Sequence, residues 1–87
     1  MASLRKVLEA VLSGRSDANV RFDSLRRLLK AMGFEERVRG DHFIFTRQDI
    51  IEIINLQPRN GGQAKPYQVK QVREIITRYR LTIRKRS

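Results

Sequence analysis

The chain has 87 residues, no cysteine, and 19 lysines and arginines against nine aspartates and glutamates, which gives a net charge of +10. A chain of this length fits one small domain. Without cysteine it has no disulfide, no thiol nucleophile and no thiolate zinc site. The positive charge favours a polyanionic partner such as nucleic acid, although an acidic protein partner and a merely solubilising surface stay open as alternatives.

The charge is uneven along the chain, and no segment has the pattern of a membrane span. Residues 1–46 carry nine basic and six acidic side chains, a net +3, whereas residues 47–87 carry ten and three, a net +7. No apolar run approaches the roughly 18 residues that a membrane span needs. Residues 1–14 have the pattern of an amphipathic helix rather than a signal peptide. We therefore expect a soluble, cytoplasmic protein that contacts no membrane.

Two helices are predicted in the first third of the chain. Apolar residues recur at helical spacing in residues 3–12, and residues 13–19 have the composition of a loop. A second helix follows, with Asp23 as its expected N-cap and Gly33 as its left-handed end. Its apolar stripe consists of Leu25, Leu28, Leu29 and Met32.

The apolar period then changes from 3.6 to 2, which indicates three strands. Residues 34–40 alternate in polarity, and the following Arg-Gly-Asp sequence predicts a hairpin turn. In the second strand, Phe43 and Phe45 are the largest apolar groups and must face the helices. Parity then places His42 on the opposite, helix-free face or at its rim. Residues 49–56 form the third strand, which Pro58 ends.

A last helix is predicted to begin at Pro66, after a loop over residues 59–65. Its inner face carries Val69, Val72, Ile75, Ile76 and Tyr79. The order helix–helix–strand–strand–strand–helix predicts an α+β domain, with a three-stranded antiparallel sheet and helices on one face. The basic tail is expected to fray.

His42 is the single histidine and the candidate for chemistry. RNA cleavage without a metal uses the 2′-hydroxyl of the substrate as nucleophile, so the protein supplies a general acid or base and cations for the phosphate. An imidazole suits this role near neutral pH. From the residues alone, a surface histidine without any chemical role stays open. A Ser-His-Asp site has no suitably placed serine, and the scattered acids predict no metal site and no cofactor.

Several cations are predicted to contact phosphates beside His42. Arg37 and Arg39 share its strand face by parity, and the Gly-Gly-Gln-Ala-Lys-Pro stretch places Lys65 before a helix N-terminus, which favours anions. Lys70 and Arg73 on the last helix complete the predicted RNA-binding set. The alternative for the glycine-rich stretch is an ordinary connection from strand to helix.

Residues 22–79, about two-thirds of the chain, resemble the HicA-type toxins of bacterial toxin–antitoxin pairs. The shared features, in order, are a helix ending in Met-Gly-Phe, the Gly-x-His-x-x-Phe pattern from Gly40 to Phe45, Pro58 after the third strand, and a final helix opening with Lys-Pro. The resemblance implies a double-stranded-RNA-binding-like fold, endoribonuclease activity on mRNA, and inhibition by a HicB-type antitoxin. The family histidine on the second strand matches His42.

The chain departs from the family pattern at three places. Asp41 stands where members often have serine or asparagine, and Phe43 stands where some have a second histidine. Arg59 and Asn60 follow Pro58, where others carry another histidine. If a second histidine assists in other members of the family, a lysine, an arginine or a backbone group must take its place in this chain.

The resemblance divides the chain into three parts: an N-terminal helix and loop (1–20), a HicA-like RNA-binding and catalytic domain (21–81), and a basic tail (82–87). The leading hypothesis is a metal-independent mRNA-cleaving toxin. A non-catalytic RNA- or DNA-binding module and a small protein with an acidic partner are the alternatives.

Overall fold

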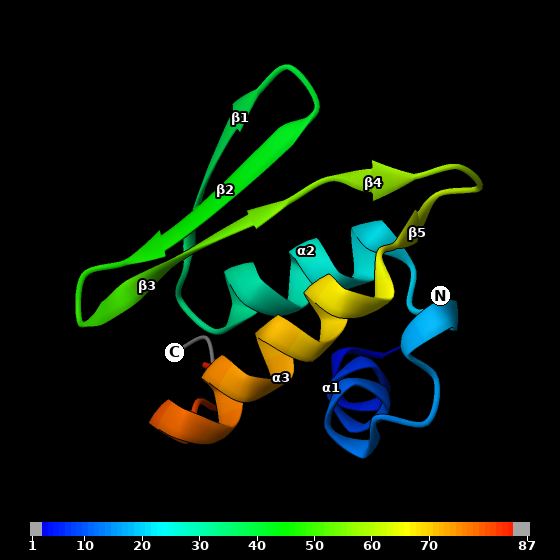
Figure 1. Cartoon of the computed structure of the whole chain (residues 1–87). Coiled ribbons are helices and arrows are strands. Elements are labelled where there is room, and N and C mark those ends of the chain that lie inside the picture. The colour runs from blue at the N-terminus through cyan, green and yellow to red at the C-terminus, as the bar shows by residue number, and fades with distance from the viewer. Residues whose placement is uncertain (1–2, 85–87) are drawn as a thin grey trace.

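The computed structural model describes residues 3–84 and confirms the predicted α+β order and the three-stranded antiparallel sheet (Figure 1). The elements in chain order are α1 (Leu4–Ser13), the 3₁₀ turn η1 (Asp17–Asn19), α2 (Phe22–Ala31), β1 (Glu35–Arg39), β2 (His42–Arg47), β3 (Ile50–Leu56), β4 (Pro58–Arg59), β5 (Gln63–Ala64) and α3 (Pro66–Tyr79). Strands β1, β2 and β3 form a meander, and β4 pairs with β5 in a second, small sheet.

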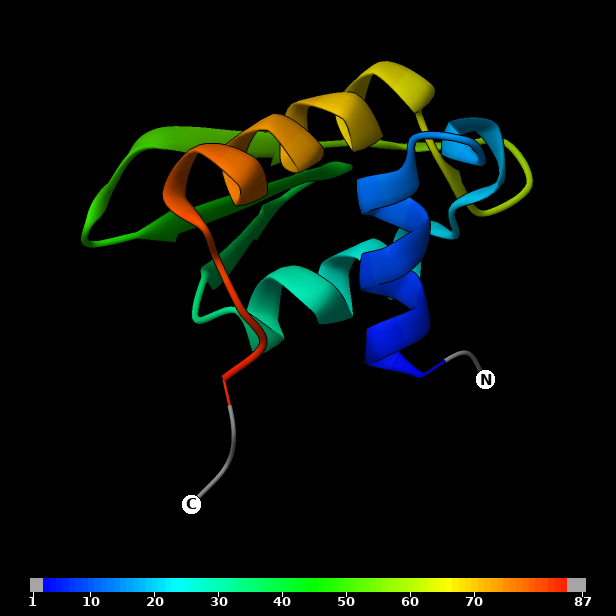
Figure 2. The same cartoon turned by 90° about the horizontal axis from the view of Figure 1, so that it is seen from below.

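The molecule is layered, with α2 and α3 between the three-stranded sheet and α1 (Figures 1 and 2). Helix α1 contacts both α2 and α3, and its Val7 and Val11 side chains are buried in the common core. The N-terminal helix therefore packs as part of the same hydrophobic core as the rest of the chain. One face of the sheet is left without a helix.

The start of α2 differs from the prediction. The helix begins at Phe22, with Arg21 at the N-cap position, so Asp23 is not the cap and instead pairs with Arg26 at 3.2 Å. The cause is tertiary, because the Phe22 N–H donates to the Gly62 carbonyl at 3.0 Å and the β5 segment pairs alongside. The other end follows the prediction: Gly33 has φ 94°, a left-handed conformation that suits glycine.

The segment predicted as a plain loop forms a hairpin. Residues 59–65 include the β4–β5 pairing, and Gly61 and Gly62 turn it with φ values of 87° and 76°. The Ala64 N–H donates to the Val20 carbonyl at 2.8 Å, which ties the hairpin to the start of α2. This arrangement places Lys65 at the N-cap of α3.

The segment after α3 does not fray as predicted. Leu81 and Ile83 pack against the hydrophobic core, and the Arg84 N–H donates to the Ala31 carbonyl at the end of α2, 2.8 Å away (Figure 2). Apolar side chains at alternate positions explain this docking, since they cover the open end of the core. Residues 85–87 of the predicted tail lie outside the described residues.

Strand parity is as predicted from the phenylalanines. Phe45 is fully buried against the helices. Phe43 meets the Phe22 ring edge-on, with 5.0 Å between centroids, and lies under the Arg26 guanidinium. In the β1–β2 hairpin Arg39 pairs with His42, so Gly40 and Asp41 form the expected two-residue turn. The helix-free face accordingly carries Glu35, Arg37, Arg39, His42, Ile44, Thr46, Ile51, Ile53 and Asn55.

An ion pair fixes β1 to α2. The Arg26 guanidinium donates from Nε and Nη2 to the two Glu36 oxygens at 2.7 and 3.1 Å, and the Glu36 side chain is only 10% exposed. The hydrogen bond from Arg26 holds the pKa of the Glu36 carboxyl below its ordinary value. Because a lowered folded-state pKa stabilises the fold only while the group is ionised, this support is lost on acidification through that pKa. At neutral pH the pair keeps the β1 arginines on the helix-free face.

Candidate functional site

His42 is the first residue of β2 and lies on the helix-free face, directly after the tight turn at Gly40 and Asp41. Its side chain is 46% exposed, and Arg39 is its cross-strand partner. An imidazole in this position is open to a ligand on one side and supported by the sheet on the other.

Both ring nitrogens of His42 have polar neighbours. Nδ1 lies 3.2 Å from Oδ1 of Asn55, on the adjacent strand β3. Nε2 lies 3.2 Å from the amide nitrogen of Gln57 and 3.7 Å from a carboxylate oxygen of Asp41. The imidazole is therefore held on both sides by side chains from two other segments.

Lys65 reaches this group from the N-terminus of α3. Its Nζ donates to Oε1 of Gln57 at 3.2 Å, so a single side chain separates the lysine from the histidine. Two residues singled out from sequence, 23 positions apart, thus meet in one cluster. We call His42, Asp41, Asn55, Gln57 and Lys65 the His42 cluster.

A buried glutamine fastens the end of β3 to α3. Gln68 is only 4% exposed. Its Oε1 accepts the backbone N–H of Gln57 at 3.2 Å, and its Nε2 donates to the backbone carbonyl of Asn55 at 3.1 Å. Because Gln68 makes hydrogen bonds to the backbones of Asn55 and Gln57, it fixes the positions of their side chains beside His42.

Replacing Gln68 tests whether its two hydrogen bonds to the backbone at the end of β3 stabilise the fold. Gln68→Leu should lower the free energy of unfolding by about 1–3 kcal/mol, because it leaves the partly buried N–H of Gln57 and carbonyl of Asn55 without their side-chain partners. Denaturant unfolding measures the change, with Gln71→Leu on the same helix as the matched control. An equal loss of unfolding free energy in the two variants would mean that the hydrogen bonds of Gln68 do not stabilise the fold.

Of the residues predicted to contact phosphate, some lie beside His42 and others lie away from it. Arg37 and Arg39 are exposed on the helix-free face beside His42. Lys70 is exposed on α3, and within residues 3–84 no hydrogen bond or ion pair joins it to the His42 cluster. Arg73 faces away, since its guanidinium binds the Asp17 carboxylate at 2.9 and 3.1 Å and the Val11 carbonyl at 3.0 Å. Arg73 thus joins α3 to η1 and α1, a structural role.

Apolar side chains complete the helix-free face. Ile53 is 63% exposed, and Ile51 nearby on β3 is 91% exposed. A groove of about 460 Å³ runs beside Ile53 and Ile44 and is bordered by Arg37, Arg39 and the two glutamates Glu35 and Glu36. The arginines and isoleucines of this face, next to an imidazole, suit a ligand with both charged and flat apolar parts.

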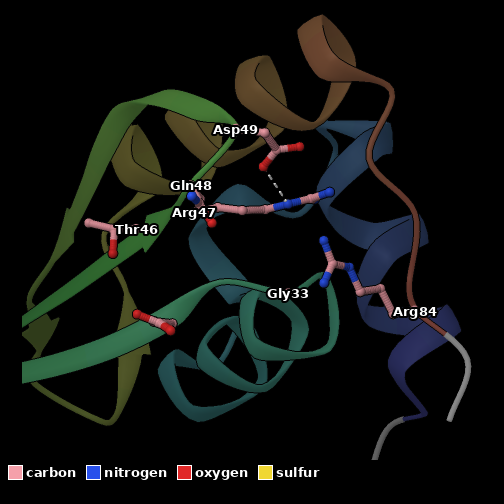
Figure 3. A pocket seen from close by; sticks show the side chains of 7 residues that line it. Gly33, Thr46, Arg47, Gln48, Asp49 and Arg84 are labelled. Carbon is pink, nitrogen blue, oxygen red and sulfur yellow. Dashed lines mark ion pairs between the residues drawn. The ribbon is translucent and has the colours of Figure 1, made fainter.

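A second hollow, of about 790 Å³, lies at the other end of β2 (Figure 3). Arg47 and Arg84 reach it from β2 and from the C-terminal segment. Arg47 is bound in place, since its Nη1 donates to the Met32 carbonyl at 2.9 Å and its Nε lies 2.9 Å from Asp49 in an ion pair without hydrogen-bond geometry. Thr46, the β2 residue of this hollow nearest to His42, lies four residue steps along the strand from it, about 13 Å. It is not part of the His42 cluster.

Within residues 3–84, no three histidine, aspartate or glutamate side chains gather closely enough to hold a metal ion. Over the same residues, no helix has the length and apolar character needed to cross a membrane.

Sequence reasoning found His42, Arg39 and Lys65 but missed Asn55, Gln57 and Gln68. Asn55 and Gln57 carried a usable signal, because they are polar residues at alternate positions where an otherwise apolar strand ends. Gln68 carried none, since a glutamine within a helix is ordinarily exposed.

No protein-family model, no curated protein and no solved structure matches the chain.

Proposed function

We propose that this chain is a metal-independent endoribonuclease of the HicA type that cleaves mRNA, with His42 as the general acid or base. The observation that carries the proposal is the His42 cluster, a half-exposed imidazole fixed through both nitrogens, with Arg39 as its cross-strand partner and Lys65 one side chain away. Proton transfer and charge stabilisation are the two contributions that RNA cleavage needs from a protein.

The reaction uses the nucleophile of the substrate. The 2′-hydroxyl attacks the adjacent phosphorus and gives its proton to the His42 imidazole, while the bond from phosphorus to the 5′-oxygen breaks. The departing 5′-oxygen takes a proton from water. The products are a 2′,3′-cyclic phosphate and a 5′-hydroxyl, and Arg39 and Lys65 stabilise the added negative charge at phosphorus.

The resemblance to HicA-type toxins around Gly40 to Phe45 adds a cellular role and a protein partner to the proposal. The chain would act in the cytoplasm as the toxin of a toxin–antitoxin pair, with a HicB-type antitoxin as its inhibitor. An open reading frame for a short acidic protein next to the gene, and rescue of growth on co-expression, are the expected signs of that partner.

Cleavage of defined RNA tests the chemistry. Purified protein should cut an RNA oligonucleotide equally well with and without EDTA, because neither the nucleophile nor the proton acceptor requires a metal. An oligonucleotide with 2′-deoxyribose throughout should stay intact, since it lacks the nucleophile. Product analysis should show the 2′,3′-cyclic phosphate. Loss of cleavage in EDTA, or cutting of the deoxy substrate, would contradict the mechanism.

Binding is expected to depend steeply on salt. The slope of log affinity against log salt should be about −0.7 for each phosphate neutralised on single-stranded RNA. Arg39→Glu and Lys65→Glu should each flatten the slope, whereas Lys6→Glu on α1 makes the same charge change in the layer away from the sheet and should not. Filter binding over a salt series measures this. Tight, salt-dependent binding without cleavage would favour the alternative, a non-catalytic RNA-binding module, which the arginines and isoleucines of the helix-free face could serve alone.

A further inference from the structure

We propose that Gln57 is a positioning residue that keeps the His42 proton on Nδ1 and leaves Nε2 as the nitrogen that accepts a proton. The tautomer follows from the geometry alone, and only its catalytic consequence rests on the proposed function. Gln57 lies between β3 and β4, with its backbone held by Gln68 and its side-chain amide between His42, Asp41 and Lys65.

The orientation of the Gln57 amide is dictated by its neighbours. A lysine ammonium can only donate, so the atom facing Lys65 at 3.2 Å must be the carbonyl oxygen. An ionised carboxylate can only accept, so the atom facing Asp41 at 3.4 Å must be the NH₂ group. A flipped amide would set N–H against ammonium and oxygen against carboxylate. Two independent neighbours therefore exclude the flip that an amide side chain usually permits.

This fixed amide determines the state of the histidine. The Gln57 NH₂ group has a second hydrogen to donate, and its nitrogen lies 3.2 Å from Nε2 of His42. A donor there requires a lone pair on Nε2, so in the neutral ring the proton sits on Nδ1. Nδ1–H then donates to Oδ1 of Asn55 at 3.2 Å. Within residues 3–84 the Asn55 side-chain amide has no hydrogen-bond partner besides His42, so it can turn to suit the ring. The Gln57 amide cannot turn, so it determines the tautomer of the ring.

The arrangement prepares Nε2 for proton transfer. A histidine side chain in water favours the opposite tautomer, with its proton on Nε2, so the cluster reverses the intrinsic preference. The substrate hydroxyl takes the place of the Gln57 N–H at the Nε2 lone pair and delivers its proton there. The Asp41 carboxylate, 3.7 Å from Nε2, is then the partner of the positively charged ring. The imidazole need not move during the step.

Nitrogen NMR of the ring tests the tautomer directly. The chain has one histidine, so protein without a histidine tag gives a single pair of imidazole nitrogens. At a pH where the ring is neutral, we expect a protonated Nδ1 and an unprotonated Nε2. In Gln57→Leu the proton should shift towards Nε2, as in a histidine side chain surrounded by water. In Gln57→Glu it should reside on Nε2, because the carboxylate there can only accept.

Two further variants separate this effect from general perturbation. Gln48→Glu adds the same charge in the turn after β2 and should keep the wild-type tautomer. The double variant Asp41→Asn with Lys65→Met leaves Gln57 in place but frees its amide, and it should lose the preference. This double variant keeps the test decisive if Gln57→Leu fails to fold.

The outcomes distinguish this inference from the proposed function. RNA cleavage in Gln57→Leu should slow by about 2- to 10-fold, because the loss of one hydrogen bond shifts the tautomer equilibrium by about that factor. A wild-type ring with its proton on Nε2, or a tautomer unchanged in Gln57→Leu and in the double variant, would overturn the role of Gln57 even if RNA is cut. The expected tautomers in a protein that cuts no RNA would uphold the positioning and refute the nuclease.

Discussion

His42→Gln protein should fold normally and cleave RNA about 100- to 10,000-fold more slowly than the wild type, the range typical for loss of a general acid or base. Glutamine keeps a polar side chain of similar length but cannot take up the proton of the 2′-hydroxyl. The side chain is 46% exposed at the end of a strand, so it contributes little to packing. Function and stability should therefore separate in this variant.

Single-turnover cleavage with purified protein measures the rate, and thermal unfolding checks the fold. Glu9→Gln, on the exposed side of α1, is the control and should retain full activity. Induced in bacteria, the wild type should arrest growth and fragment mRNA, while His42→Gln should do neither. The variant should still bind the antitoxin if that contact uses the basic and apolar surface. Wild-type cleavage by purified His42→Gln protein would leave only the binding-module interpretation.

The position of His42 was predictable because a strand residue can lie on only one of the two faces of the sheet. Once Phe43 and Phe45 face the helices, an odd offset puts His42 on the other face, and no detail of packing enters the argument. The Gly-Asp turn and Pro66 are equally local signals. The α+β order follows from the change in apolar period, which each segment carries on its own.

The contacts of Arg73 and the start of α2 could not be predicted in this way, because they join segments far apart in the sequence. Arg73 pairs with Asp17, 56 positions away, and this pairing depends on how α1 packs across α3. Periodicity could place Arg73 on a helix but could not show what it meets. The same holds for the start of α2, where pairing with β5 overrides Asp23 as a cap.

Phe45→Ala should lower the free energy of unfolding by about 3–5 kcal/mol, the cost typical of emptying a buried phenylalanine site. Phe45 has no exposed surface and lies between Glu36 of β1 and Ile54 of β3, at the centre of the sheet and against the helices. Small domains have about 5–15 kcal/mol of stability in total, so the variant should be marginal at 37 °C.

Denaturant unfolding of Phe45→Ala beside Ile51→Ala makes the comparison that decides the parity. Ile51 is 91% exposed on the neighbouring strand, and its truncation should change stability by no more than about 0.5 kcal/mol. A large loss for Phe45 with almost none for Ile51 means that the helices cover the phenylalanine face and leave the face of His42 open. Equal losses would mean that both faces are covered. An RNA chain could not then reach the imidazole, so the stability of a phenylalanine variant bears directly on the nuclease mechanism.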